Sequence, residues 1–165
     1  ADFDDDNDGK YTKQELSELF IEKHQDKVKW EFISSSQKLS EDFIIKHKNE
    51  LLMDYVFMFQ ILSEEFIDKY DDIIDWNSIS QYQELSEEFI EKHINEINWI
   101  SISMVQYLSE EFIEKYKDNV EWQNISFNQK LSEKFIIRNK DRIYFPLLYK
   151  NIKIDEKAKS VAFDL

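Results

Sequence analysis

The chain has 165 residues, of which 42% are hydrophobic and 15% aromatic, so it is long and apolar enough to form one folded domain with a core. Lys and Arg total 21 against 35 Asp and Glu, which gives a formal net charge of -14 at pH 7. This charge argues against direct binding to nucleic acid or to anionic membranes and favours a protein partner with a basic surface. The absence of cysteine excludes disulfides, thiolate metal sites and cysteine nucleophiles.

Membrane insertion and secretion signals are also absent from the sequence. Apolar runs stay well below the roughly 20 residues that a transmembrane helix needs, and no signal peptide is recognisable. We therefore expect a soluble protein. Because Ala1 stands where an initiating Met would be, we expect that an upstream segment was removed.

The first element in chain order is an acidic loop that contains the only glycine of the chain. Residues 4 to 15 match the pattern D-x-[DN]-x-[DN]-G-x5-E at every position, and Gly9 permits the sharp turn around an ion. Carboxylate and carbonyl oxygens at this spacing are the ligands that calcium prefers. The predicted Ca2+ ligands are Asp4, Asp6, Asp8, Lys10 through its backbone carbonyl, Thr12 and Glu15.

This segment resembles the calcium loop of an EF-hand. The resemblance implies an exiting helix that begins near Lys13 and continues into the first helix of the repeats described below. Ser17 would then lie inside a helix, and calcium bound by Glu15 would act as the N-terminal cap of the repeats.

Six tandem repeats follow without insertion, each 23 residues long and each beginning with a leucine. Counted from that leucine, position 2 is always Ser, position 5 always Phe and position 8 always basic. Ser is a preferred N-cap, and acidic residues after it with a basic residue near the far end match the helix dipole. A first short helix is therefore predicted in every repeat. Three i,i+4 ion pairs are expected to support it: Glu65 with Lys69, Glu88 with Lys92, and Glu111 with Lys115.

A second helix is predicted in each repeat by the pattern W-x-x-I-S-x-x-Q, as in 76–83, because its apolar and small residues recur at helical spacing. A leucine-rich repeat also fits a 23-residue period, but its L-x-x-L-x-L-x-x-N signature is missing. The expected fold is all-α, with short two-helix repeats stacked as an α-solenoid. The expected domains are a calcium loop (1–15), six helical repeats (16–153) and a C-terminal capping half repeat (154–165).

Repeat 2 departs from the pattern, because MDYVFMFQ replaces W-x-x-I-S-x-x-Q and adds Met53, Phe57 and Phe59. These residues are either an irregular part of the core or an exposed contact patch. Repeat 6 loses the pattern in its second half, where the only proline, Pro146, occurs.

Recurring polar residues are interpreted as structural. His24, His47 and His93 occupy position 9, where other repeats have Tyr or Asn, which indicates a packing or rim position in preference to a zinc site. The glutamines at position 22 are expected to form a hydrogen-bonded ladder between repeats. Neither a phosphate-binding glycine loop nor HExxH or a supported Ser-His-Asp order occurs, so no enzyme activity or catalytic residue is predicted.

Residues 16 to 153 resemble the tandem LSEEFIEKY...W..IS..Q repeats of uncharacterised proteins from large DNA viruses, phages and some bacteria. The resemblance implies no activity, and it is compatible with a location in a virion or in the cytoplasm of an infected cell. The sequence thus predicts a non-enzymatic, calcium-binding repeat protein that acts as a structural or protein-protein interaction module. Two alternatives stay open: an acidic nucleic-acid mimic that inhibits a basic DNA-handling protein, and a calcium-dependent regulatory sensor.

Overall fold

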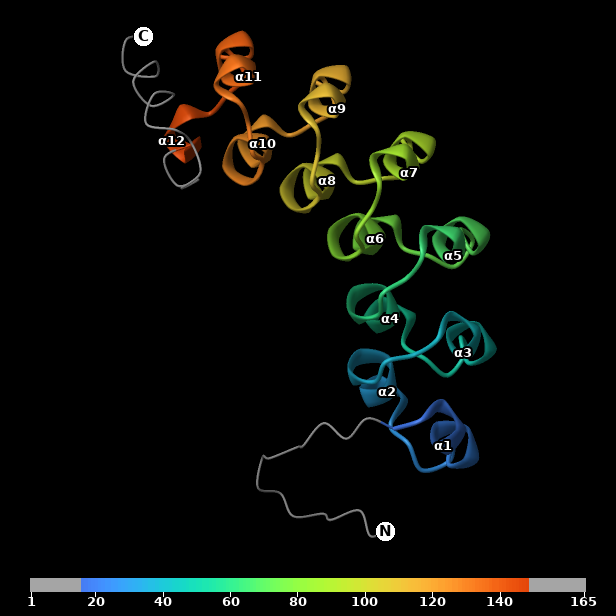
Figure 1. Cartoon of the computed structure of the whole chain (residues 1–165). Helices are drawn as coiled ribbons and strands as arrows, with labels where there is room; N and C mark the ends of the chain where they lie inside the picture. Colours follow the sequence, from blue (N-terminus) through green and yellow to red (C-terminus); the bar gives the residue numbers. More distant parts are fainter. Residues whose placement is uncertain (1–15, 149–165) are drawn as a thin grey trace, which may run out of the picture. The chain divides into compact units, whose positions relative to one another are not determined.

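The computed structural model describes residues 16–148, and these residues form only helices and connecting turns (Figure 1). Every repeat contributes a six-residue first helix and a longer second helix, except that the last second helix is cut to four residues. The prediction of an all-α fold built from helix pairs is therefore confirmed. The helices are α1 (Glu18–Lys23), α2 (Trp30–Ser36), α3 (Glu41–Lys46), α4 (Met53–Phe59), α5 (Glu64–Lys69), α6 (Trp76–Tyr82), α7 (Glu87–Lys92), α8 (Trp99–Val105), α9 (Glu110–Lys115), α10 (Trp122–Asn128), α11 (Glu133–Arg138) and α12 (Phe145–Leu148).

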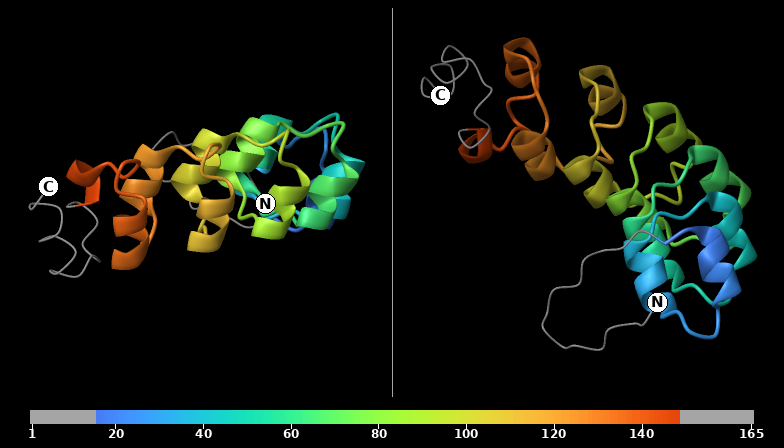
Figure 2. Two further views of the ribbon diagram at one scale, coloured as in Figure 1. Left: turned by 90° about the horizontal axis from the view of Figure 1, so that it is seen from above. Right: turned by 60° about the horizontal axis from the view of Figure 1, so that its bottom comes forward.

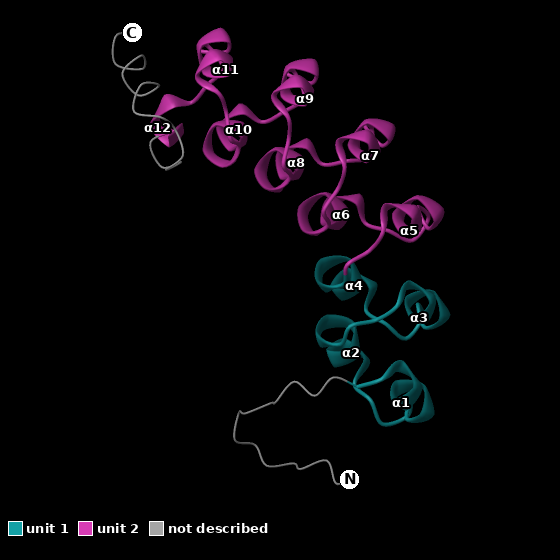
Figure 3. Ribbon diagram, in the orientation of Figure 1, with its two compact units in different colours: residues 1–60 teal, residues 61–165 magenta. Residues whose placement is uncertain are grey.

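The chain divides into two compact units, residues 1–60 and 61–165 (Figure 3). In unit 1 the second helices α2 and α4 pack on each other. In unit 2, α8 lies between α6 and α10, and α10 also packs on α12. Each unit thus stacks its helix pairs in the manner of an α-solenoid, where every repeat contacts its neighbours.

Unit 2 has two rows of helices that are easy to follow in Figures 1 and 2. The first helices α5, α7, α9 and α11 form the outer row of an arc, and the second helices α6, α8, α10 and α12 form its inner row (Figure 1). None of the helices between residues 16 and 148 has the length and apolar character needed to cross a membrane.

Most of the core comes from four positions of the repeat. The isoleucine after the invariant Phe is the most buried residue of the first helix, as in Ile67 and Ile90, neither of which is exposed at all. The Phe before it is buried in repeats 2 to 6, as are the leucine that opens each of repeats 2 to 5 and the Ile or Val of the second helix in repeats 1 to 5. Burying such side chains stabilises the fold by about 1.5–3 kcal/mol each, so the repeated core positions dominate stability.

The first helices begin after a capping serine in all six repeats, as the pattern predicted. In each one the Ser Oγ accepts a hydrogen bond from the backbone N–H of the Phe three residues later. This includes Ser17, whose extended backbone (φ -70°, ψ 147°) places it outside α1. The prediction that a helix runs through Ser17 from an EF-hand loop is therefore wrong, because Ser17 itself has an extended backbone and supplies the N-cap of α1.

Second helices start less uniformly. Asp75, Asn98 and Glu121 cap α6, α8 and α10 by accepting backbone N–H groups of the first turn. Lys29 and Leu52 occupy the same place before α2 and α4 and make no side-chain cap bond. All five of these helices end at the position 22 glutamine, whose own backbone N–H closes the last turn.

The unusual residues of repeat 2 are divided between core and surface. Phe57 is buried, with 2% of its surface exposed, whereas Phe59 is 54% exposed. At the other end of the described chain, α12 contains Pro146 in its first turn, where the missing N–H costs little. The C-terminal half repeat predicted for 154–165 lies outside the described residues.

Candidate interaction surfaces and the bonds between repeats

The six predicted calcium ligands, Asp4, Asp6, Asp8, Lys10, Thr12 and Glu15, lie outside the described residues. Within residues 16–148, no group of three or more His, Asp or Glu side chains is placed to hold a metal ion. The site chemistry of the described chain therefore lies in its surfaces and in the bonds that join one repeat to the next.

The predicted glutamine ladder is present in both units. The Gln106 Nε2 donates to the Gln83 carbonyl oxygen at 2.7 Å and its Oε1 accepts from the Leu85 N–H at 3.0 Å. The Gln60 amide does the same in unit 1, with Nε2 to the Gln37 carbonyl oxygen at 2.8 Å. Each of these side chains is buried, so its bonds replace water that is excluded from the stack.

A second set of bridges, which the sequence analysis did not predict, comes from the Ser of the I-S pair in the second helix. The Ser103 Oγ donates to the Trp99 carbonyl oxygen at 2.7 Å and accepts from the Glu121 N–H of the next repeat at 2.8 Å. Ser34, Ser80 and Ser126 make the same two bonds. A small polar residue that recurs inside an apolar pattern was the available signal, because such a residue needs a partner when it is buried.

The first glutamate of the first helix forms a third bridge that the sequence analysis missed. The Glu64 carboxylate accepts from both the backbone N–H and the Oγ of Ser86 in the next repeat, at 2.5 and 3.1 Å. The same pairing joins Glu18 to Ser40, Glu87 to Ser109 and Glu110 to Ser132. Each of these four serines thus caps its own helix and is hydrogen-bonded to the first helix of the preceding repeat.

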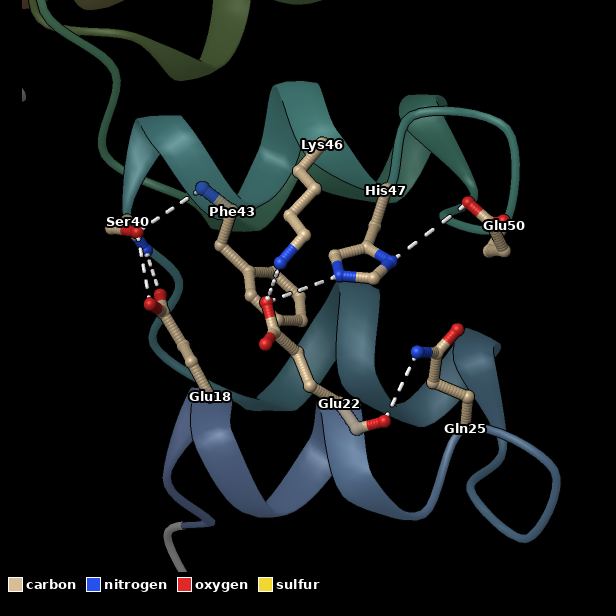
Figure 4. A network of polar contacts seen from close by, with 8 residues as sticks. All are labelled: Glu18, Glu22, Gln25, Ser40, Phe43, Lys46, His47 and Glu50. Atoms are coloured by element: carbon tan, nitrogen blue, oxygen red, sulfur yellow. Dashed lines mark hydrogen bonds and ion pairs between the residues drawn. The ribbon is translucent and has the colours of Figure 1, made fainter.

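Figure 4 shows the hydrogen bonds between Glu18 and Ser40 beside an ion-pair network in unit 1. The Glu22 carboxylate on α1 lies 2.5 Å from the Lys46 Nζ on α3, and this hydrogen bond lowers the pKa of Glu22. It also lies 3.6 Å from the His47 Nε2, which is too far for a hydrogen bond. The His47 Nδ1 is 4.0 Å from Glu50, so carboxylates face both ring nitrogens.

Unit 2 repeats this arrangement. Asp68 on α5 pairs with Lys92 of α7 and lies 2.8 Å from the His93 Nε2, and its pKa is lowered, first by Lys92 and then by His93. Lys115 pairs with Glu91 at 2.7 Å. Lys92 and Lys115 are thus bonded to the preceding repeat, and the predicted i,i+4 pairs with Glu88 and Glu111 are wrong. The reason is the stacking of first helices, which brings a carboxylate of the neighbouring helix closer.

The histidines occupy packing positions, as their alternation with Tyr predicted. The His47 ring lies against Trp30 of the preceding repeat and Phe43 of its own, with centroids 5.3 and 4.4 Å apart. His93 and Tyr116 hold equivalent places, the latter against Trp99. Aromatic contacts of this kind add about 0.5–1.5 kcal/mol beyond area burial, so a structural role explains these rings.

The two rows of helices in unit 2 present different chemistry to solvent. On α5, α7 and α9, positions 4, 7 and 8 of each repeat carry a charge and are exposed or half-exposed. We call these residues the outer face: Glu65, Asp68, Lys69, Glu88, Glu91, Lys92, Glu111, Glu114 and Lys115.

On the second helices of unit 2, three exposed positions of each repeat carry no formal charge. Positions 16, 20 and 21 of α6, α8 and α10 are exposed and hold amide or apolar side chains. We call these residues the inner face: Asn77, Gln81, Tyr82, Ile100, Met104, Val105, Gln123, Phe127 and Asn128. In a chain with 34% charged residues, this separation marks the inner face as a candidate interaction surface.

No protein-family model, curated protein or solved structure matches this chain. The fold and the bonds between repeats define its class, which is an α-helical repeat protein with short helix pairs stacked through buried polar ladders.

Proposed function

We propose that this protein is a non-enzymatic, calcium-binding helical-repeat protein that acts as a structural or protein-protein interaction module. This proposal is supported by the structural role of the recurring polar residues, which join neighbouring repeats. Glutamines at position 22, serines at positions 2 and 19, and acidic residues at positions 3 and 7 bond one repeat to the next. Their repetition is explained by stacking, and the exposed residues of the second helices vary between repeats.

Calcium binding is supported by the complete loop motif of residues 4 to 15. Coupling of this loop to the repeats is supported by the neighbouring residue, since Glu15 directly precedes Leu16 in the sequence and the Leu16 N–H donates to the Gln37 Oε1 at 2.6 Å. An ion that fixes Glu15 would also fix Leu16 and so favour the first rung of the ladder.

Calorimetric titration with Ca2+, paired with thermal unfolding in calcium and in chelator, tests this part of the proposal. We expect stoichiometric binding and a higher Tm in calcium, and we expect Glu15→Gln to weaken both. Amide exchange of residues 16–38 should slow in calcium because repeat 1 adjoins the ion. If neither binding heat nor a Tm shift is observed, residues 4 to 15 are only an acidic segment and the calcium assignment is overturned.

The interaction role is tested by affinity purification with the full chain as bait in calcium, followed by a binding constant for the identified protein. A saturable partner supports the role, and the absence of any partner in extracts of the source overturns it. Repeating the measurement in chelator tests the calcium-sensor alternative, which requires the affinity to change.

The nucleic-acid mimic has less support, because many carboxylates of the first helices are already engaged. Asp68 and Glu91 are paired with Lys92 and Lys115, and the position 3 glutamates are hydrogen-bonded to serines. Position 4 remains acidic only from repeat 2 to repeat 5, between Leu19 in repeat 1 and Lys134 in repeat 6. Partner binding that disappears at high salt would favour this alternative.

A further inference from the structure

We propose that the inner face of unit 2 binds an amphipathic helix of a partner protein, apolar on one side and rich in Lys and Arg on the other. This inference rests on the proposed interaction function and assigns it a surface and a partner chemistry.

The centre of the inner face is apolar. Ile100 and Met104 stand at i and i+4 of α8, so they share one side of the helix, and Ile100 is 63% exposed. Tyr107, which is 90% exposed, follows two residues after the helix ends. Val105 on the same helix and Phe127 on the adjacent α10 are also exposed. Because α8 packs between α6 and α10, the patch lies in the middle of the row, where a partner would bury it most completely.

The turns that lead into these second helices supply negative charge along one edge of the patch. Asp71 and Asp72 precede α6, Glu96 precedes α8 and Asp118 precedes α10, and all four are exposed. Lys117 is the basic residue of these three turns, and Asp118 is paired with Arg142 of the following turn at 2.9 Å. The edge is therefore acidic through Asp71, Asp72 and Glu96. An apolar centre beside an acidic edge complements a helix that has Leu-like residues on one side and basic residues next to them.

The arrangement and charge of unit 2 favour a helix over a second copy of the chain. The second helices, which carry the inner face, form the inner row of the arc in unit 2 (Figure 1). Two copies would also bring together chains with a net charge of -14 each, which repel. A helix about 10–12 Å across presents a convex surface that can lie against such a row.

The test uses a fluorescein-labelled peptide of Leu and Lys, about 18 residues long, with Leu at helical spacing on one side. Its binding to the full-length protein is measured by fluorescence anisotropy at physiological salt. The test variant carries Ile100→Gln and Met104→Gln, because repeats 5 and 3 already hold Gln123 and Gln81 at these positions. The matched control is Ile137→Gln, which removes an exposed isoleucine from the first-helix side of the same unit.

We expect saturable binding, a rise in Kd of about tenfold or more for the double variant, and no change for Ile137→Gln. A peptide with Glu in place of Lys should not bind. Failure of the Leu/Lys peptide to bind, or equal binding by the double variant, overturns the proposal. Binding that is lost instead with Glu88→Gln and Glu111→Gln moves the site to the outer face and leaves the interaction function standing. Sedimentation that shows a dimer only for the unaltered protein assigns the inner face to a second copy and also overturns the proposal.

Discussion

The Gln106 side chain joins repeats 3 and 4 through the Gln83 carbonyl oxygen, which accepts from its Nε2 at 2.7 Å, while the Leu85 N–H donates to its Oε1 at 3.0 Å. Gln106→Ala would leave both backbone groups without this partner inside the stack. We expect the free energy of unfolding to fall by about 3 kcal/mol, because each unsatisfied buried group costs about 1–3 kcal/mol. Urea unfolding followed by circular dichroism measures the loss. Gln81→Ala, on the exposed side of α6, should change stability by less than about 0.5 kcal/mol, and equal losses in both variants would contradict the ladder.

Ser103 provides a second test of the stack. Ser103→Ala removes the Oγ that accepts from the Glu121 N–H at 2.8 Å, so the next second helix loses support at its N-cap residue. We expect a loss of about 1–3 kcal/mol, measured by thermal unfolding. The matched control is Ser101→Ala in the same helix, whose Oγ makes no bridge to the next repeat. A variant as stable as the control would show that the Ser103 bridge does not stabilise the stack.

A capping serine has two roles, as the N-cap of its own helix and as a hydrogen-bond partner of the preceding repeat, and a mutation can separate them. Ser109 caps α9, since its Oγ accepts from the Phe112 N–H at 3.1 Å, and it also donates to Glu87 at 3.1 Å. Asp is as good an N-cap as Ser, so capping alone predicts that Ser109→Asp is neutral. Because a second carboxylate would face Glu87, we expect this variant to lose about 1 kcal/mol of stability.

Combining Ser109→Asp with Glu87→Gln should restore most of that loss, since the amide can donate to the new carboxylate. A fully stable single variant would show that the bond between Glu87 and Ser109 is unimportant.

The Asp68 ion pair predicts a pH dependence. Its pKa is held below the usual 3.8, first by the Lys92 hydrogen bond and then by His93. A carboxylate whose pKa is lowered by folding stabilises the folded state at pH values above its unfolded-state pKa. This stabilisation is lost as the pH falls through its folded-state pKa. We therefore expect Asp68→Asn to lower the urea midpoint at pH 7 and the difference from the unaltered protein to shrink below pH 3.8.

The size of this effect should be small, because Asp68 is 36% exposed and salt screens such pairs. Asp72→Asn, which removes an exposed carboxylate of the same repeat, is the control. A difference that is the same at pH 7 and at low pH would indicate that the ion pair does not stabilise the fold.

Local features of the sequence predicted local structure well. The Ser at position 2 marked the start of each first helix, and the Trp at position 15 marked the start of most second helices, because caps and helical periodicity act within a few residues. The failed predictions involve neighbours. Lys92 is four residues after Glu88 and 24 after Asp68, yet it pairs with Asp68. Ser17 was assigned to a helix interior by analogy with an EF-hand, and its own capping preference prevailed.

The sequence by itself determined the period of the fold, the two helices of each repeat and the presence of a glutamine ladder, since each depends on short-range spacing or on a glutamine that recurs in repeats 1 to 5. The stacking of one repeat on the next decided which polar groups meet. Residues 18 to 26 apart in the chain come within hydrogen-bond distance only when neighbouring helices have a particular axial position and rotation relative to each other. Ser103 and Glu121 are an example. The same packing decided that Phe57 is buried while Ile100 and Met104 stay exposed beside each other. Exposure depends on which side of a helix its neighbours cover, and that is a property of the assembled repeats.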